Sequence, residues 1–339
     1  MTRRIIRITF PIILIIVVYA LGPTPEKPVW DPAPVEVPDD PDGLEQYVAN
    51  QEAKHKLKPD NEARIIWADS MRARTPYSVV YIHGFSASQE EGDPVHETFA
   101  RTFGCNLYLA RMADHGVDTT EQLHYFTADR WWHSSKEALA IGKALGDKVI
   151  LMSTSTGGTM SLILAATYPA DVFAMINMSP NIALYDPLAW LANNPWGLQI
   201  ARTVKGGNYN ITPVSAGADS TLDLRYWNHK YRLEAVSELV ELVESSMSNE
   251  LFERISQPVI NLYYYKNEQE QDNQVSVAAI FAMHNQLATP DSMKVAVPIP
   301  NAGGHVLGSH VVSKDVESVN RAVREFSTGK LRMHPREPD

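Results

Sequence analysis

A strand, a sharp turn and a helix, with a serine at the apex of the turn, constrain this chain more than any other feature. The apolar run Val149–Met152 leads into Ser153-Thr154-Ser155-Thr156-Gly157-Gly158, and a helical pattern of small and apolar residues follows. In the pattern G-x-S-x-G, such a turn strains the backbone of the serine and raises its hydroxyl above the sheet. Ser155 is therefore the predicted nucleophile, attacking a carbonyl carbon. Ser153 replaces the first glycine of the pattern, and we expect its role to be steric because only a small side chain fits there.

Beyond about residue 60, apolar runs of strand length alternate with helical patterns. The expected strands are Ala63–Ala68, Ser78–Ile82, Asn106–Ala110, Lys148–Met152, Val172–Met178, Val259–Tyr265 and Lys294–Ile299. The expected helices are Trp132–Leu145, Thr156–Tyr168, Val277–Leu287 and Asp315–Phe326. Several strand runs are nearly continuous and β-branched, as in strands that are covered on both faces. The alternation predicts an α/β fold with a mostly parallel, doubly wound sheet, and an apolar content of 44% is ordinary for a globular core.

One long stretch interrupts this alternation. Residues 184–257 separate two expected strands by far more than a connecting loop requires. They contain a helix-like segment from about Arg232 to Ile255 and several aromatic residues, of which Trp190, Trp196 and Trp227 are the candidate substrate-binding residues. We expect a mainly helical cap inserted over the site, which divides the core into residues 44–183 and 258–328, with a tail at 329–339. The alternative is that the aromatic residues form a small core of the cap itself.

The first 43 residues differ in composition from the rest. Arg3, Arg4 and Arg7 precede an apolar run that ends at Leu21, a charge asymmetry typical of a signal peptide. The segment 1–22 is short for a membrane-spanning helix of about 20 apolar residues, so a cleaved signal peptide and a retained anchor both remain open. Either implies export to the periplasm or the cell exterior, with attachment to the inner membrane if the segment is retained. Residues 23–43 are rich in proline and predict an extended tether.

A serine nucleophile needs an oxyanion hole, a base, and an acid that orients the base. The expected strand Ser78–Ile82 is followed by His83-Gly84-Phe85-Ser86. A histidine-glycine pair after a strand lets the backbone bend so that the next N–H faces the nucleophile. The predicted oxyanion donors are therefore the backbone N–H groups of Phe85 and Thr156. His83 is expected to be a buried structural residue that bonds nearby backbone groups.

The base and the acid are expected after the last two strands. His305 follows the last expected strand and two glycines, so it is the predicted general base, with His310 as the other candidate. Three carboxylates compete for the acid, and Asp272 is favoured over Glu268 and Glu270 because an apolar anchor follows it three residues later. The resulting order of serine, aspartate and histidine along the chain matches one of the three common serine-hydrolase arrangements.

Charge and cysteine content exclude several other classes of protein. The net charge of −10 argues against a nucleic-acid binder, which would carry a basic face. Cys105 is the single cysteine of the sequence, so neither an intrachain disulfide nor a cysteine-based zinc site can form. No histidine pair has metal-ligand spacing. We therefore expect no metal and no organic cofactor, and the sequence leaves the oligomeric state open.

Taken together, these motifs resemble those of the α/β-hydrolase superfamily over nearly all of residues 60–328, and within it bacterial carboxylesterases and monoacylglycerol lipases. The resemblance rests on His83-Gly84-Phe85-Ser86, Asp114-His115-Gly116, Asp129-Arg130-Trp131-Trp132, Ser155-Thr156-Gly157-Gly158, Asp272 with Val275, and His305. The departures are Ser153 in place of glycine and a loop around Asp272 that is a few residues longer than usual. The resemblance implies an α/β-hydrolase fold and hydrolysis of carboxylic esters through an acyl-enzyme, with a mobile cap that admits an acyl chain.

Other functions use the same residues and remain open. The same triad could serve an amidase, a peptidase or an acyltransferase, and the scaffold could also belong to a catalytically silent binding protein. The expected partner is a small ester with an apolar or aromatic acyl group. Membrane contact through the N-terminal segment is expected if that segment is not cleaved. The sequence does not identify the ester.

Overall fold

The computed structural model describes residues 12–215 and 217–336. Its main sheet has seven strands in the order β1-β3-β2-β4-β5-β8-β9, and only β1 runs antiparallel to its neighbour. These strands are β1 Arg64–Ile66, β2 Thr75–Ile82, β3 Asn106–Leu109, β4 Gly146–Thr154, β5 Val172–Met178, β8 Val259–Tyr263 and β9 Lys294–Pro298. The prediction of an α/β fold with a mostly parallel, doubly wound sheet is confirmed.

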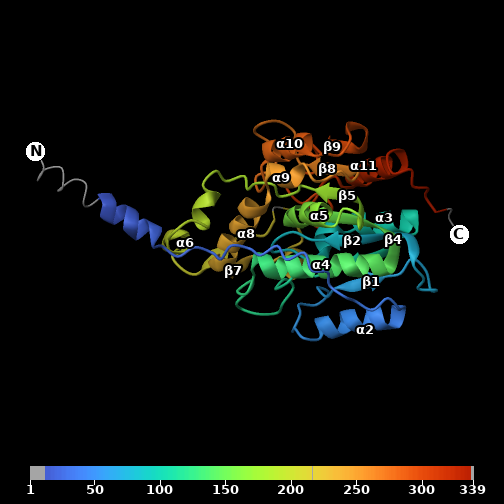
Figure 1. Cartoon of the computed structure of the whole chain (residues 1–339), viewed down its shortest axis with the longest axis horizontal. Coiled ribbons are helices and arrows are strands. Elements are labelled where there is room, and N and C mark those ends of the chain that lie inside the picture. The colour runs from blue at the N-terminus through green and yellow to red at the C-terminus, as the bar shows by residue number, and fades with distance from the viewer. Residues whose placement is uncertain (1–11, 216, 337–339) are drawn as a thin grey trace, which may run out of the picture.

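Helices cover both faces of this sheet (Figure 1). One face packs against α4 (Ala128–Leu145) and α5 (Thr156–Thr167), and the other against α3 (Val95–Phe103) and α11 (Val316–Gly329). Two separate apolar clusters result, one on each face. This explains the nearly continuous apolar strands, because a central strand such as β4 must bury both of its faces. The remaining core helices are α2 Pro41–Glu52, α9 Asn249–Phe252 and α10 Val277–Gln286.

The stretch at residues 184–257 holds small elements next to one end of the sheet (Figure 1). They are η2 Ala189–Ala192, α6 Gly197–Lys205, β6 Tyr209–Ile211, α7 Ser220–Tyr226, β7 Lys230–Arg232 and α8 Leu233–Ser246, with α9 at the return to the core. The expected single helix over 232–255 is wrong. α8 ends at Ser246, and the Ser248 side chain then accepts a hydrogen bond from the N–H of Leu251 and starts α9. Serine favours such an N-cap position over a helix interior, and it therefore divides the segment.

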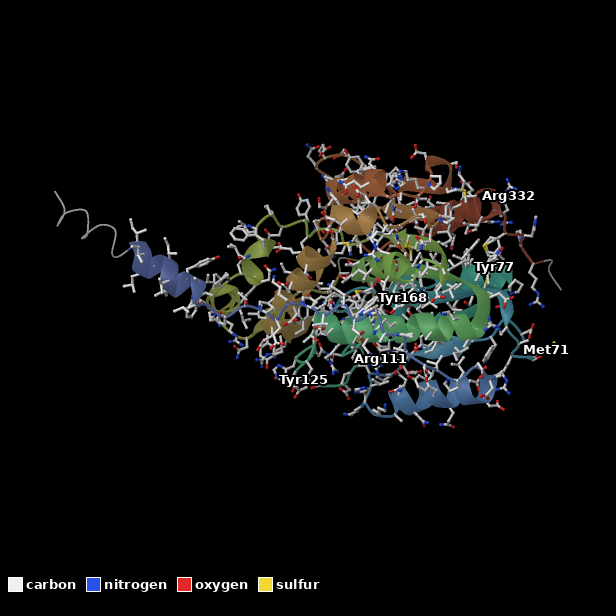
Figure 2. The ribbon with its side chains drawn as sticks, viewed as in Figure 1. Met71, Tyr77, Arg111, Tyr125, Tyr168 and Arg332 are labelled. Carbon is white, nitrogen blue, oxygen red and sulfur yellow. The ribbon has the colours of Figure 1, made fainter. Side chains whose placement is uncertain are left out.

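The proline-rich segment is extended, as its composition predicts, but it is bound to the core along its length. The indole of Trp30 packs edge-on against Trp132 with ring centroids 5.8 Å apart. The backbone carbonyl of Asp31 accepts hydrogen bonds from the Trp132 indole and from Lys136. The hydroxyl of Tyr168, labelled in Figure 2, donates to the carbonyl of Pro32. The proline-rich segment has no neighbouring strand, so side chains from α4 and from the end of α5 supply hydrogen bonds to its backbone carbonyls.

The boundary of this segment also differs from the prediction. Helix α2 begins at Pro41, inside the range 23–43 assigned to the tether, and the Asp40 side chain caps it by accepting from the N–H of Gly43. A proline in the first helical turn is favourable because its missing N–H would have no partner there. At the other end, residues 12–20 form a helix that projects beyond α6 (Figure 1). The predicted basic region with Arg3, Arg4 and Arg7 lies outside the described residues.

Candidate active site

Ser155 lies at the junction of β4 and α5, at the carboxyl end of the sheet. Its backbone has φ 54° and ψ −121°, a region that a non-glycine residue rarely adopts. The surrounding chain holds this conformation: the Ser155 N–H donates to the carbonyl of Met178, and the Ser155 carbonyl accepts from the N–H groups of Gly158 and Asn181. The turn is therefore the strained elbow that the sequence pattern predicts, with the hydroxyl at the start of a helix.

Gly157 and Ser153 show why small residues flank this serine. A Cβ atom on Gly157 would lie 2.0 Å from the carbonyl oxygen of Ile82, so only glycine allows α5 to approach β2 this closely. Ser153 is fully buried and donates its hydroxyl to the Asn177 side chain at 2.9 Å, and Asn177 in turn donates to Asn261. Ser153 thus joins a polar chain that crosses three strands, a role beyond the steric one that the sequence predicts.

His305 and Asp272 form a buried pair beside this elbow. The imidazole Nδ1 lies 2.6 Å from Asp272 Oδ2, and both side chains are almost completely buried. Asp272 Oδ1 accepts hydrogen bonds from the backbone N–H groups of Gln274 and Val275, which orient the carboxylate. The apolar anchor that follows Asp272 in the sequence thus contributes through its backbone.

The other candidates for acid and base lie elsewhere. Glu268 accepts from the hydroxyl of Tyr265, and Glu270 pairs with Lys266, both at the exposed tip of the loop. His310 is exposed and lies near Glu90 and Asp93. The structure therefore brings Asp272 to His305, and it holds Glu268, Glu270 and His310 in other interactions.

The two members of the pair shift each other's pKa. Burial opposes ionisation of Asp272, but the charge of His305 and its hydrogen bond outweigh burial and lower the pKa of the carboxyl. Burial also opposes protonation of His305, but the charge and hydrogen bond of Asp272, with a smaller contribution from Glu91, raise the pKa of the imidazole. Both shifts favour an ionised Asp272 beside a protonated His305.

Two buried histidines shape the loop that follows β2. His83 Nε2 accepts from the N–H of Met112, and its Nδ1 donates to the carbonyl of Gly84. His115 Nε2 accepts from the N–H of Ser86, and its Nδ1 donates to the carbonyl of Ala113. Burial lowers the pKa of both imidazoles, so they stay neutral. The structural role expected for His83 is confirmed, and His115 fixes the far side of the same loop.

A cavity of about 790 Å³ joins these residues under the cap. Ser155, His305, Phe85 and Thr156 all line it, so the residues predicted to supply the nucleophile, the base and both oxyanion donors surround one space. The cap contributes nine larger aliphatic side chains to the remaining wall, which are Leu184, Leu188, Leu191, Ile200, Val204, Leu233, Val236, Leu239 and Val240. Polar and charged cap residues, among them Asp186, Lys205 and His229, line it as well. The volume, and a wall that combines aliphatic side chains with polar groups, are typical of a small-molecule site.

The three tryptophans predicted to bind substrate separate in the structure. Trp227 lines the cavity and is nearly buried. Trp190 and Trp196 are exposed and do not line it, so the structure does not bring them to the candidate site. The Trp196 indole instead donates to the carbonyl of Val18, which attaches the cap to the N-terminal helix. The sequence also gave no reason to choose Glu91, which lines the cavity from a short helical turn at residues 89–92.

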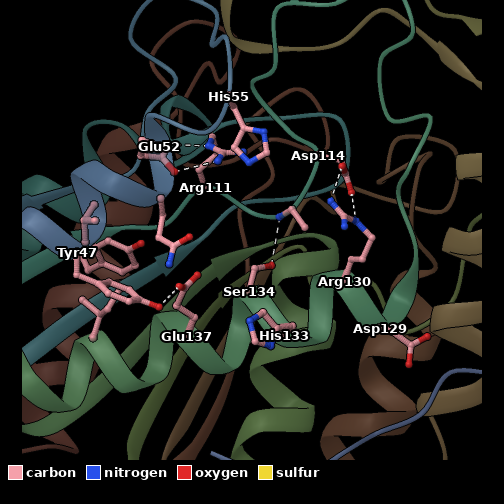
Figure 3. A pocket seen from close by; sticks show the side chains of 15 residues that line it. Tyr47, Glu52, His55, Arg111, Asp114, Asp129, Arg130, His133, Ser134 and Glu137 are labelled. Carbon is pink, nitrogen blue, oxygen red and sulfur yellow. Dashed lines mark hydrogen bonds and ion pairs between the residues drawn. The ribbon is translucent and has the colours of Figure 1, made fainter. Parts of the chain in front are cut away.

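A second cavity, of about 460 Å³, lies between α2 and α4 and has a different character (Figure 3). Its charged side chains face one another: Arg111 bonds Glu52, and Arg130 bonds Asp114. These ion pairs satisfy its principal charges, and none of the predicted catalytic residues lines it. The cavity under the cap is therefore the candidate active site.

The sheet order, the strained serine and the buried histidine–aspartate pair define an α/β-hydrolase fold. Solved structures with this fold are similar over most of the chain. A structure of the metagenome-derived lipolytic enzymes LipS and LipT has a TM-score of 0.64 and 18% identity, covering 80% of this chain and all of that one. The monoacylglycerol lipase of Paleococcus ferrophilus has a TM-score of 0.56 and 15% identity, covering 78% and 96%. Est1E of Butyrivibrio proteoclasticus, with bound ferulic acid, has a TM-score of 0.50 and 20% identity, covering 80% and 95%.

These similarities confirm the predicted resemblance to α/β-hydrolases at the level of the fold. No family model matches the sequence, and a search of curated proteins found no match.

Proposed function

We propose that this protein is a serine hydrolase that cleaves carboxylic esters through an acyl-enzyme intermediate. The observation that carries the proposal is the shared cavity: a strained serine and a histidine that is hydrogen-bonded to a buried aspartate line the same apolar space. The structural neighbours, described as lipases and esterases, support the same chemistry by analogy of fold.

The proposed mechanism assigns one task to each group. His305 takes the proton of Ser155 as its Oγ attacks the ester carbonyl, and Asp272 stabilises the imidazolium that forms. The backbone N–H groups of Phe85 and Thr156 stabilise the oxyanion. His305 then protonates the departing alcohol, and a water molecule repeats the sequence on the acyl-enzyme to release the acid. Apart from the ester and the water molecule, these steps use only groups of this chain.

The wall of the cavity supports an ester with an apolar acyl group. The cap supplies mainly aliphatic side chains, and Trp227 and Tyr231 add aromatic surface. The aliphatic part of this wall favours an acyl chain or an aromatic acid, because binding there removes apolar surface from water. We therefore propose an esterase or a monoacylglycerol-lipase-like enzyme, and place amide hydrolysis and acyl transfer second because nothing in the cavity favours an amine or excludes water.

Replacement of the nucleophile tests this proposal. Ser155→Ala should lower kcat for p-nitrophenyl esters by a factor of roughly 10⁴ or more. It should also prevent labelling by a fluorophosphonate. The melting temperature should change little, because the substitution removes only the hydroxyl group. Profiling of acyl-chain length beside an anilide control then separates esterase from amidase. Full activity in the alanine variant contradicts the assignment of Ser155 as the nucleophile. A wild-type protein that neither turns over nor labels contradicts the proposal and favours a silent binding protein.

The N-terminal segment supports export and membrane contact as a further part of the proposal. Residues 12–19 and Leu21 are large hydrophobic residues with exposed side chains. The helix formed by residues 12–20 is attached to the cap through Trp196. Among the described residues, no helix is long and apolar enough to cross a membrane. We propose that the uncleaved segment lies at a membrane surface outside the cytoplasm. Cell fractionation of the full chain and of a chain lacking residues 1–22 tests this: both chains remaining in the soluble cytoplasmic fraction would contradict it.

A further inference from the structure

Glu91 is a buried carboxyl group at the candidate active site that the proposed mechanism leaves unused. It belongs to the short helix η1 (Gln89–Gly92) and is only 3% exposed. It lines the cavity together with Ser155 and His305. A buried acid in an apolar cavity needs a partner or a function, because burial of an unpaired charge is costly.

Its partner is the backbone of the oxyanion loop. The N–H of Gly84 donates to Glu91 Oε2 at 2.5 Å. Gly84 immediately precedes Phe85, whose N–H is a proposed oxyanion donor, so the carboxylate restrains the peptide next to that donor. The space around Gly84 is tight on both sides: a Cβ atom there would lie 2.9 Å from Glu91 Oε2 and 2.9 Å from Ser155 Cβ. The carboxylate and the nucleophile thus flank the same glycine.

Glu91 and the general base His305 line the same cavity, and the charge of Glu91 is the smallest of the contributions that raise the pKa of His305. The titratable groups that face Glu91 are His305, from the loop after β9, and Tyr81, from β2. In the described part of the chain, no lysine or arginine forms an ion pair with it. Burial raises the pKa of Glu91 to about 7, although the Gly84 hydrogen bond and His305 oppose the shift. The carboxyl therefore ionises in the pH range in which a histidine base becomes active.

We propose that Glu91 is a positioning residue for ester hydrolysis: it holds the Gly84–Phe85 backbone in place and sets a second negative charge beside His305. The inference rests on the proposed function. Asp272 already orients the imidazole by direct contact, whereas Glu91 reaches it only through space. The hydrogen bond of Glu91 to Gly84 is a task separate from its effect on His305, because a fixed acceptor for Gly84 keeps the oxyanion donor in place before the substrate arrives.

Two substitutions separate these tasks. Glu91→Gln keeps an oxygen that can accept from Gly84 but removes the charge, whereas Glu91→Leu removes both. Glu90→Gln is the matched control, since Glu90 is the adjacent acid of the same short helix and does not line the cavity. Each variant is compared with the wild type by kcat and KM for a short-chain ester, by the pH profile of kcat/KM, and by the pH profile of Ser155 labelling with a fluorophosphonate.

The expected results differ between the variants. Without the negative charge, protonated His305 loses stabilisation, so Glu91→Gln should move the acid limb of kcat/KM to lower pH by about half a unit to one unit. Glu91→Leu should show the same shift and lose roughly 10²-fold in kcat, comparable with the loss of one oxyanion donor, at nearly unchanged KM. Glu90→Gln should keep the wild-type profile. A purely structural role would lower the melting temperature without moving the acid limb.

The outcomes also separate this inference from the proposed function. An active wild type with an unshifted acid limb in Glu91→Gln overturns the positioning role and leaves the esterase proposal intact. If the esters are not hydrolysed but labelling of Ser155 shifts with pH as predicted, Glu91 acts as proposed and the substrate class is wrong. A wild-type protein that shows neither hydrolysis nor labelling overturns both.

Discussion

The ends of the core strands and the inner face of the cap line the same cavity but are built differently. On the core side, Ser155, Asp272 and His305 are buried, and hydrogen bonds from the backbone hold the serine turn and the carboxylate. On the cap side, part of the wall is made of aliphatic side chains that remain open to solvent, such as Ile200 at 51% and Val204 at 78% exposed. Few directional contacts restrain them.

This difference assigns separate tasks to the two regions. Catalytic chemistry requires fixed geometry, and a parallel sheet supplies it because its carboxyl strand ends cannot move independently. Binding of an apolar acyl group requires contact area, and exposed aliphatic side chains supply it without fixed geometry. Substitutions in the core should therefore alter kcat and stability, whereas substitutions in the cap should alter KM and the preference for acyl length.

The largest expected effect comes from the acid of the core. Asp272→Asn should lower kcat by roughly 10⁴-fold, because an amide favours the wrong tautomer of His305 and stabilises its charge poorly. KM should change little. Steady-state kinetics with a p-nitrophenyl ester measure the effect, and Glu270→Gln, on the exposed part of the same loop, should retain wild-type activity. Equal losses in the two variants would show that the loop, and not the Asp272–His305 pair, matters.

A pair of glycines compares the tolerance of the two regions directly. Gly157→Ala in the core should cost about 1–3 kcal/mol of stability, since the added Cβ meets the carbonyl oxygen of Ile82 and backbone must move. Gly207→Ala in the cap should change stability by no more than about 0.5 kcal/mol, because nothing lies within 4 Å of the added atom. Urea denaturation of both variants measures this, and a cap variant as destabilised as the core variant would remove the distinction.

The smallest effect is expected at the wall of the cap. Ile200→Ser should raise KM for a decanoyl ester about fivefold, since an aliphatic side chain that the acyl chain covers contributes about 1 kcal/mol to apolar binding. It should leave an acetyl ester unaffected. Trp190→Ser is the control, because Trp190 is similarly exposed but lies outside the cavity. An equal change for both esters, or for both variants, would show that the cap does not select the acyl chain.

Several local patterns in the sequence were sufficient to predict the structure. The range 172–178 is a strand at the predicted bounds, and the elbow, the order of the strands along the chain and the structural role of His83 agree with their patterns. These features depend on short stretches of chain, where periodicity, a glycine or a small residue restricts the backbone directly. The division of the cap helix at Ser248 could also have been predicted from the sequence, because serine is a common N-cap.

Other features depended on contacts between distant segments. Trp190, Trp196 and Trp227 are chemically alike and close in sequence, yet only Trp227 faces the cavity, because Trp196 bonds the N-terminal helix 178 residues away. The docking of the proline-rich segment on Trp132 and Lys136 joins residues about a hundred positions apart. No local pattern encodes such contacts, since they form only when the whole core has assembled.

The sequence by itself determined the nucleophile turn, the alternation of strands and helices, and the residue types of an acid and a base at the strand ends. The tertiary structure decided which carboxylate meets His305, which aromatic residue lines the cavity, and that Glu91 lies against Gly84. The physical reason is the distance along the chain over which each interaction acts. Backbone strain and hydrophobic periodicity act over a few residues, whereas burial and the pairing of charges depend on segments that only the folded sheet brings together.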